Sequence, residues 1–342
     1  MKNSSIGLDI GTTTLRIAMV SRNKDSFSLD SIAVSPSTPR GINSEAQADH
    51  KALSDLITQM LQTSGIKSKE VTVSLPENQV YTKVIEMPQL SEQELAGSLK
   101  FEMEQYVPLP LDQVKTDWQI LNKKENSGKK TMNVLLVAAP LSLLAKYEKI
   151  VEMAGLSLYA VETEIISIYR ALSPLINSAA PSMIVHIGAS NTNVAILKNN
   201  NLETVFSINL GGLALTRAIS IDLGIDVVQA ENFKKAYGLS QQAFNGKIGR
   251  SLQPVLDSLV SDIKKALLLF KEKNSEEVKQ LVLSGGSALL PGIDAYFTHT
   301  LGAQTILGNC WNAYNLKNVP DEVRVEAPSY SVVIGSALRD VV

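Results

Sequence analysis

The hydrophobic pattern near the start of the chain recurs in its second half. Residues 6–20 read IGLDIGTTTLRIAMV, and residues 184–197 read IVHIGASNTNVAIL. In both segments an apolar run meets a small polar turn that begins with glycine, and a second apolar run follows, which is the pattern of a β-hairpin. Aligning Gly11 with Gly188 gives an offset of 188 − 11 = 177 residues, about half of the 342. The pattern predicts a duplicated fold, and a chance likeness of two hairpins is the alternative.

Further helices and strands follow each hairpin. Apolar residues recur at helical spacing in 45–64, after the first hairpin. After the second, we predict strands at 202–208 and 281–283, with helices between them at 212–222, 226–237 and 249–273. This alternation of strands and helices is typical of the α/β class.

Residues 71–155 read as a module inserted between the two halves. Ser91 and Glu94 form a capping box that predicts a helix reaching Tyr106. The other expected elements are strands at 71–75, 79–87, 116–121 and 131–138, a polar turn at 122–130 and a helix at 141–154. The order strand, strand, helix, strand, strand, helix predicts a compact two-layer α+β unit.

Composition narrows the class of protein. The net charge is −2, and the lysines and arginines are scattered, which disfavours a nucleic-acid partner. Cys310 is the single cysteine, which excludes an internal disulfide, and the three histidines lack metal-ligand spacing. The start shows no secretion signal, and no run approaches the roughly 18 apolar residues of a membrane span. We therefore expect a cytoplasmic protein.

The first hairpin turn carries chemistry suited to phosphate. Asp9 lies next to the last residue of the first apolar run, two residues before the turn of Gly11, Thr12, Thr13 and Thr14. Glycine lets the backbone approach a phosphate closely, and the threonines supply amide and hydroxyl donors. A carboxylate there would face Mg²⁺ through water, because magnesium keeps much of its hydration shell. An ordinary hairpin turn explains the hexapeptide equally well, and its repetition in the second half favours phosphate binding.

Two such hairpins resemble the phosphate motifs of the actin, sugar-kinase and heat-shock-chaperone superfamily. Within it the chain is similar to the PilM family of type IV pilus assembly, through residues 83–114, 156–172 and 211–239. The resemblance covers nearly the whole chain. It implies an actin-like (ribonuclease H-like) two-lobed duplicated α/β fold with an inserted α+β subdomain, 1C. The expected domains are 1A at residues 1–70, 156–177 and 326–342, 1C at 71–155, 2A at 178–225 and 278–325, and the helical 2B at 226–277.

The resemblance also implies a nucleotide site that takes ATP and Mg²⁺. Asp9 would hold the metal through water, and the first turn and its repeat would hold phosphates. Glu231 and Lys234 lie one helical turn apart, where the family places a pair around ribose and adenine, although an exposed ion pair gives the same spacing. The residues implied in binding beyond the first turn are Gly188, Ala189, Ser190, Asn191, Gly211, Gly212, Glu231, Lys234, Gly285, Gly286 and Ser287.

The second turn departs from the family pattern. His186 stands where the family has an aspartate. An imidazole cannot offer two carboxylate oxygens, so His186 either donates to a phosphate or is a satisfied histidine at the edge of the core. Glu164 lies where relatives place a carboxylate that orients water, or it is a helix-start glutamate favoured by the macrodipole. We expect ATP to bind, hydrolysis to be slow or absent, and the nucleotide to brace the two halves.

For partners, the resemblance implies a scaffold. Proteins of this family capture the N-terminal cytoplasmic segment of PilN in a groove between 1A and 1C, so residues 83–110 are the implied surface. Other pilus machinery proteins, including the assembly ATPase, are further expected partners. The membrane is reached only through partners, at its inner face, and a homo-oligomer is left open.

Two other functions remain as alternatives. An active ATPase or small-molecule kinase would need a catalytic aspartate beside a substrate hydroxyl, and no polar insertion resembles a sugar site. A filament-forming cell-division protein similar to FtsA shares the inserted subdomain. FtsA also carries a C-terminal amphipathic membrane helix, whereas this sequence stops at Val342.

Overall fold

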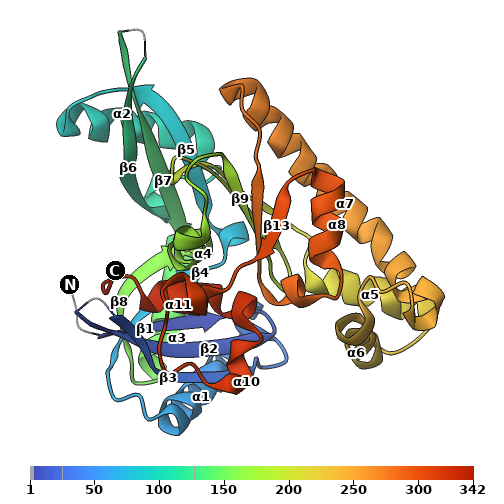
Figure 1. The fold of residues 1–342 in the computed structure, drawn as a ribbon. Coiled ribbons are helices and arrows are strands. Elements are labelled where there is room, and N and C mark those ends of the chain that lie inside the picture. Colours follow the sequence, from blue (N-terminus) through green and yellow to red (C-terminus); the bar gives the residue numbers. More distant parts are fainter. Residues whose placement is uncertain (1–3, 25, 127) are drawn as a thin grey trace.

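The computed structural model describes residues 4–24, 26–126 and 128–342. It has two lobes, each built on a five-stranded sheet, and a third, three-stranded sheet that stands above the first lobe in Figure 1. Among the residues that the structure describes, no helix is long and apolar enough to cross a membrane.

The first lobe is a mixed sheet with helices on both faces. The strand order is β3 (Ser26–Pro36), β2 (Thr14–Asn23), β1 (Ser4–Ile10), β4 (Glu70–Leu75) and β8 (Ser157–Thr163). Helices α1 (Gln47–Ser64) and α3 (Leu141–Met153) cover the face that carries Leu8 and Ile17. The other face, with Ala18, packs against α4 (Glu164–Leu172) and α11 (Ser331–Ala337). Because strand side chains alternate between faces, Asp9 lies on the face that α4 and α11 cover.

The second lobe repeats this sheet. Its order is β11 (Asn201–Ile208), β10 (Thr192–Lys198), β9 (Ser182–Ile187), β12 (Gln280–Ser284) and β13 (Gln304–Leu307). Gly7 pairs with Ala18 in the first hairpin and Ile184 pairs with Ala195 in the second, so both partners shift by the same 177 residues. The sequence-predicted duplication is therefore confirmed.

Helices complete the second lobe and join it to the first. The long helices α5 (Gly212–Leu223), α6 (Val227–Tyr237), α7 (Lys247–Asn274) and α8 (Ile293–Leu301) pack on the second sheet through one apolar cluster. Two short helices, α9 (Cys310–Ala313) and α10 (Asp321–Arg324), lead back to α11. Tyr330 and Trp311, which come just before α11 and within this return path, are buried in the core shared by the lobes.

The third sheet is the inserted unit. Its order is β5 (Tyr81–Pro88), β7 (Lys129–Pro140) and β6 (Val114–Asn126), and α2 (Glu92–Tyr106) packs on it. The predicted capping box is present, because the Ser91 backbone N–H donates to the Glu94 carboxylate at 2.9 Å and Ser91 caps the Glu94 amide. Leu95, Leu99 and Met103 face the sheet and form a core separate from those of the lobes.

The bounds expected for the inserted unit, 71–155, need correction. Strand β4 pairs in parallel with β1 and β8 and so belongs to the first sheet. Helix α3 buries Tyr147 and Ile150 in the first-lobe core. The chain therefore leaves the first lobe after β4 and returns before α3, because both elements complete the first-lobe core.

The hairpin of the inserted sheet is also longer than predicted. Residues 122–126 continue β6 rather than belonging to the polar turn expected at 122–130. Polar residues are compatible with strand pairing there because 122–125 are not buried. In Figure 1 this hairpin projects beyond α2 into solvent.

Candidate functional site

The two hairpin turns have the same backbone geometry and face each other. The Gly11 N–H donates to the Thr14 carbonyl at 3.1 Å, and the Gly188 N–H donates to the Asn191 carbonyl at 2.9 Å. The hydroxyls of Thr12 and Ser190 lie 3.2 Å apart, within hydrogen-bond distance across the two lobes. The polar tips predicted from the sequence are thus brought together at one place.

Glycines let two further segments approach the second turn. The N–H of Gly212, at the start of α5, donates to the Gly188 carbonyl at 2.8 Å. A Cβ on Gly211 would lie 2.7 Å from that same carbonyl oxygen, so no larger residue fits without movement. Gly285 has a φ of +85°, and its Cβ would lie 2.3 Å from the Ile187 carbonyl. These close approaches explain why glycine stands at 211 and 285; Gly286 starts the short helical turn that follows, Gly286–Leu289.

The Glu231–Lys234 pair lies beside this glycine cradle. Lys234 Nζ is 2.7 Å from Glu231 Oε2 and also donates to the Gly212 carbonyl at 2.9 Å and to Thr216 Oγ1 at 2.8 Å. Lys234 is buried, and burial lowers its pKa. The pKa of Glu231 is lowered by Lys234 and Thr216, which together outweigh the raising effect of its partial burial. The pair is therefore no loose surface ion pair: Lys234 ties α6 to the start of α5, while Glu231 stays about one-third exposed (32%).

Ser287 completes this side of the cleft. A Cβ on Gly212 would lie 2.6 Å from Ser287 Oγ and 3.3 Å from Lys234 Nζ. The structure thus gathers five of the residues implied by the family resemblance at the start of α5: Gly188, Gly211, Gly212, Lys234 and Ser287.

Asp9 of the first hairpin is paired with an arginine that sequence reasoning missed. Arg16 is the cross-strand partner of Asp9, and its Nη1 lies 3.6 Å from Asp9 Oδ2. Burial raises the pKa of Asp9, while Arg16 opposes that effect. The guanidinium also lies 5.3 Å from the centroid of the Tyr330 ring. Hairpin register alone could have identified Arg16, because a turn at 11–14 places residues 9 and 16 opposite each other.

His186 occupies the position equivalent to Asp9, since 9 + 177 = 186. It is buried, and its Nδ1 is hydrogen bonded to Ser284 Oγ at 3.0 Å. Ser284 in turn contacts the Pro328 carbonyl and the Ser331 hydroxyl. Burial lowers the pKa of His186 to about 3, and nearby Arg16 acts in the same direction. At neutral pH this side chain is a neutral, hydrogen-bonded imidazole.

Glu164 is joined to the second turn by a chain of neutral polar groups. Asn193 Nδ2 donates to Glu164 Oε2 at 2.7 Å, and Asn193 Oδ1 accepts from Asn191 at 2.7 Å and from Ser207 at 3.0 Å. The Ser190 hydroxyl donates to Asn191 Oδ1 at 3.1 Å. No pattern in the sequence marks Asn193 or Ser207 as partners of Glu164, because only the tertiary fold brings α4 beside β10.

The protonation of Glu164 limits its chemistry. Burial raises its pKa to about 8, and the charge of Asp9 adds to the shift. A carboxyl group that keeps its proton at neutral pH cannot accept one from water, so Glu164 is poorly suited to the role of general base. Its hydrogen bond to Asn193 instead makes it part of the support for the turn.

These residues suit nucleotide phosphates better than a metal ion. The glycine cradle and the exposed tips of both turns offer the close backbone approach and polar donors that phosphate needs. Across residues 4–24, 26–126 and 128–342, no group of three or more histidine, cysteine, aspartate or glutamate side chains could hold a metal ion. Asp9 is already paired with Arg16, and its counterpart is His186. For the magnesium expected at Asp9 through water, the two cross-strand pairs therefore supply one carboxylate, which is paired with Arg16.

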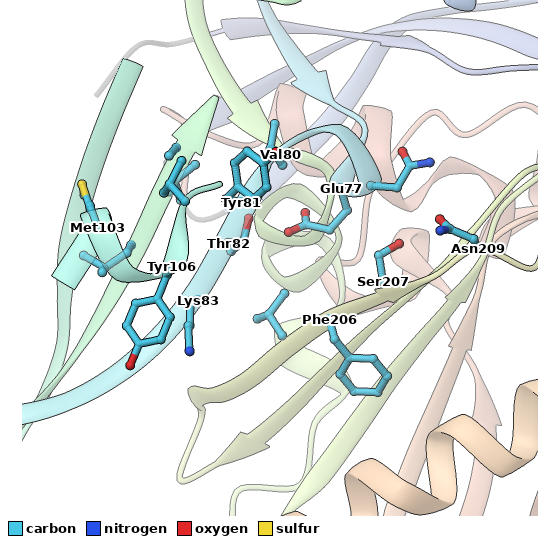
Figure 2. A pocket seen from close by; sticks show the side chains of 16 residues that line it. Glu77, Val80, Tyr81, Thr82, Lys83, Met103, Tyr106, Phe206, Ser207 and Asn209 are labelled. Atoms are coloured by element: carbon cyan, nitrogen blue, oxygen red, sulfur yellow. The ribbon is translucent and has the colours of Figure 1, made fainter. Parts of the chain in front are cut away.

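A cavity of about 390 Å³ lies between the inserted sheet and the second lobe. Tyr81, Lys83 and Tyr106 line it on one side, and Phe206 and Ser207 of β11 line it on the other (Figure 2). Lys83 Nζ lies 3.2 Å from the centroid of the Tyr106 ring. The groove expected between the first domain and the inserted subdomain stays a prediction. This cavity instead lies against β11 of the second lobe, a wall that sequence reasoning did not foresee.

Known proteins are similar to this chain over almost its whole length, in sequence and in structure. The family model described as type IV pilus assembly protein PilM matches residues 7–341. A solved structure described as a PilM-PilN type IV pilus biogenesis complex is 26% identical, with a TM-score of 0.85, and the match covers 99% of this chain and 98% of that chain. Cell division protein FtsA of Streptococcus pneumoniae serotype 2 (strain D39 / NCTC 7466) is 24% identical over 96% of this chain and 78% of FtsA. MreB 5 of Spiroplasma citri bound to AMPPNP, 14% identical, shares the fold with a TM-score of 0.53 over 99% of this chain and 96% of that one.

The duplicated sheets with two facing turns, together with these neighbours, define a protein of the actin-like ATPase fold. The inserted three-stranded unit is part of the same match, which extends over almost the whole chain. The chain belongs to the PilM family of type IV pilus assembly proteins.

Proposed function

We propose that this chain is a cytoplasmic ATP-binding scaffold of type IV pilus assembly. A nucleotide between the two turns braces the lobes, and the N-terminal cytoplasmic segment of a PilN-like inner-membrane protein lies in the cavity beside β11. This partner recruits the chain to the inner face of the membrane, where other pilus proteins, including the assembly ATPase, join it. The observation that carries the proposal is the cavity, whose walls come from two separate sheets.

The walls of the cavity favour an extended peptide. Strand β5 is an edge of the inserted sheet, and β11 is an edge of the second-lobe sheet. An edge strand presents backbone donors and acceptors to which an extended segment can add. Val80, Met103 and Phe206 among the lining residues offer apolar contacts. The volume, about 390 Å³, suits a few anchoring side chains rather than a folded domain.

Hydrolysis has little support among the side chains of the cleft. His186 is neutral and bonded to Ser284, and the pKa of Glu164 is raised to about 8. Neither group is a good acceptor for the proton of an attacking water at neutral pH. Slow or absent hydrolysis therefore fits the scaffold role and weighs against an active ATPase or a small-molecule kinase.

The test is a titration of the purified protein, with ATP present, against a fluorescently labelled N-terminal peptide of the single-span protein encoded beside it. Saturable binding is expected, and Phe206→Ala should weaken it about tenfold or more, as removal of a central aromatic anchor does. Phe101→Ala is the matched control, because Phe101 is 70% exposed and does not line the cavity. Absence of saturable binding, or equal affinity of the Phe206→Ala variant, would contradict the proposal.

A filament-forming role similar to that of FtsA is the second candidate. It is favoured by the likeness to FtsA of Streptococcus pneumoniae over 96% of this chain. Sedimentation with ATP separates the two roles. ATP-dependent polymers in the pellet would favour the filament, whereas a chain that stays in the supernatant and binds the peptide fits the scaffold.

A further inference from the structure

Behind the two turns, the hairpins carry one ion pair and two neutral polar side chains. In the first hairpin, Asp9 and Arg16 face each other across the strands, and in the second, His186 and Asn193 do so. Their formal charges at neutral pH are one negative, one positive and two neutral. Glu164 adds little negative charge, because burial raises its pKa. Of the four side chains in these two pairs, Asp9 alone is a carboxylate, and it already has a cationic partner in Arg16, so the pairs offer a divalent cation no free anionic ligand.

Arg16 has hydrogen-bonding capacity to spare. Its side chain is 17% exposed, and its Nη1 lies 3.6 Å from Asp9. Its Nε is buried and has no hydrogen-bond partner among the residues that the structure describes. A guanidinium carries five N–H donors in a planar fork that matches phosphate geometry. Tyr330 lies against the guanidinium on another side, at 5.3 Å from ring centroid to carbon, which helps to hold it in place.

The position of Arg16 brings this cation to the first turn. A Cβ built on Gly11 would lie 3.8 Å from Asp9 Oδ1, so the Asp9 carboxylate sits directly behind the turn. Arg16, which contacts that carboxylate, therefore lies one side chain away from where a phosphate would meet Gly11. Lys234 is the cation among the residues predicted to bind the nucleotide. Its ammonium group already contacts Glu231, Thr216 and the Gly212 carbonyl.

We propose that this cleft binds nucleotide phosphates without a divalent metal ion, with Arg16 supplying the positive charge that a metal would otherwise provide. The inference rests on the proposed ATP-binding function and specifies how that site is charged. Arg16 releases part of its contact with Asp9 and donates to phosphate oxygens. His186, being neutral, leaves the opposite side of the cleft free of the carboxylate that would require a metal to bridge it to phosphate.

The test measures the affinity of the full chain for a fluorescent ATP analogue, once with Mg²⁺ and once with excess EDTA. Wild-type affinity should agree within about threefold between the two buffers. Arg16→Gln should weaken binding about tenfold or more in both, as expected for loss of a hydrogen bond between charged groups. Arg16→Lys, which keeps the charge, should retain part of the affinity. Arg324→Gln, a half-exposed arginine on α10, controls for simple loss of charge.

A second variant tests the neutral side of the cleft. His186→Asp places one carboxylate in each hairpin, at positions 9 and 186. This variant should therefore bind the ATP analogue poorly in EDTA and regain affinity with Mg²⁺. Thermal unfolding of each variant shows whether it is folded. Wild-type binding that disappears in EDTA, or unchanged binding by a folded Arg16→Gln variant, would overturn the inference while leaving ATP binding intact. Absence of binding in both buffers would overturn the proposed nucleotide site together with it.

Discussion

The two hairpins of this protein share one backbone and differ in their chemistry. Strand order, register and the hydrogen bond that closes the turn are the same in both. The first hairpin carries an ion pair between Asp9 and Arg16, whereas the second carries the neutral His186 and a network centred on Asn193. Backbone geometry is thus preserved where the turns must face each other. The side chains behind them differ, with an ion pair in one lobe and neutral hydrogen bonds in the other.

The hairpins also differ in what presses against them. Gly7 of β1 lies under helix α11, and a Cβ there would be 2.3 Å from the Val333 carbonyl. Its counterpart in the second hairpin is Ile184, whose side chain is fully buried in the core between the lobes. The first sheet therefore needs glycine at position 7, whereas the second sheet has the large side chain of Ile184 at the equivalent position.

The largest expected effect is a loss of stability when Glu164, in the hydrogen-bond network of the second hairpin, loses its proton. The pKa of Glu164 is raised to about 8, from 4.5, so the folded state holds a proton that the unfolded state has lost between these pH values. Stability should therefore fall as pH rises from about 4.5 to 8, by at most about 5 kcal/mol at about 1.4 kcal/mol per pKa unit. Glu164→Gln should remove most of this decline, measured as the urea midpoint at several pH values.

His186 gives the opposite slope and serves as the control for that measurement. Its pKa is lowered to about 3, from 6.5, so the unfolded state binds a proton that the folded state does not. Stability should fall as pH drops below about 6.5, and His186→Asn should flatten only this acid side. If Glu164→Gln flattened the acid side instead, or left the alkaline decline unchanged, a protonated Glu164 in the folded state would be ruled out.

Next in size is the steric difference at Gly7. Gly7→Ala should lower the free energy of unfolding by about 3 kcal/mol, because the new methyl group meets backbone of α11 that cannot move freely. Gly97→Ala on α2 is the matched control: apart from its chain neighbours and the backbone of its own helix, no described atom lies within 4 Å of the added Cβ, and alanine should raise stability by about 0.5–1 kcal/mol through better helix propensity. Equal urea midpoints for Gly7→Ala and wild type would contradict the close packing of α11 on β1.

A smaller loss is expected from Asn193→Ala. The change removes the partner of Glu164, Asn191 and Ser207 together, and buried polar groups left without a partner cost about 1–3 kcal/mol. We expect a loss of about 2 kcal/mol by chemical denaturation. Asn312→Ala, an exposed asparagine on α9, should stay within about 0.5 kcal/mol of wild type. A similar midpoint for both variants would show that the network contributes nothing.

The smallest effect belongs to the contact between the turns. Thr12→Ala removes the hydrogen bond to Ser190, which is partly exposed to solvent. The expected loss is about 0.5 kcal/mol, or a shift of less than about 1 °C in the melting temperature by calorimetry. A shift of many degrees would mean that this contact, rather than the shared core around Trp311 and Tyr330, holds the lobes together.

The features that depend on local chemistry could be predicted from the sequence. The glycine at the head of each turn identified the duplication, and the Ser91–Glu94 capping box identified the start of α2, because both are encoded within a few residues. The positions of β4 and α3 could not be predicted in this way. Their apolar patterns fit equally well in the inserted unit or in the first lobe. The parallel pairing of β4 with β1 and β8, and the burial of Tyr147 and Ile150 of α3 in the first-lobe core, decide between them.

The residues of the candidate site also differ in whether the sequence could predict them. The glycines and the Glu231–Lys234 pair were implied by the family resemblance, and in the structure they lie together at the start of α5. Arg16 could have been predicted as the partner of Asp9 from the register of the hairpin. The Asn193–Glu164 hydrogen bond and the β11 wall of the cavity could not be predicted, because they join segments whose contact depends on how the lobes and the inserted sheet pack.

One nucleotide between the two hairpin turns, in contact with both lobes, is the feature on which the proposed scaffold depends. Calorimetric titration of ATP into the wild-type chain and into Thr13→Trp and Ser190→Trp tests it most directly. Both residues are exposed at the tips of the turns, so a bulky side chain can fill the space between the lobes without disturbing a core. We predict one ATP per chain for the wild type and loss of binding in each variant. Wild-type affinity in either folded variant would contradict a site shared by the two turns.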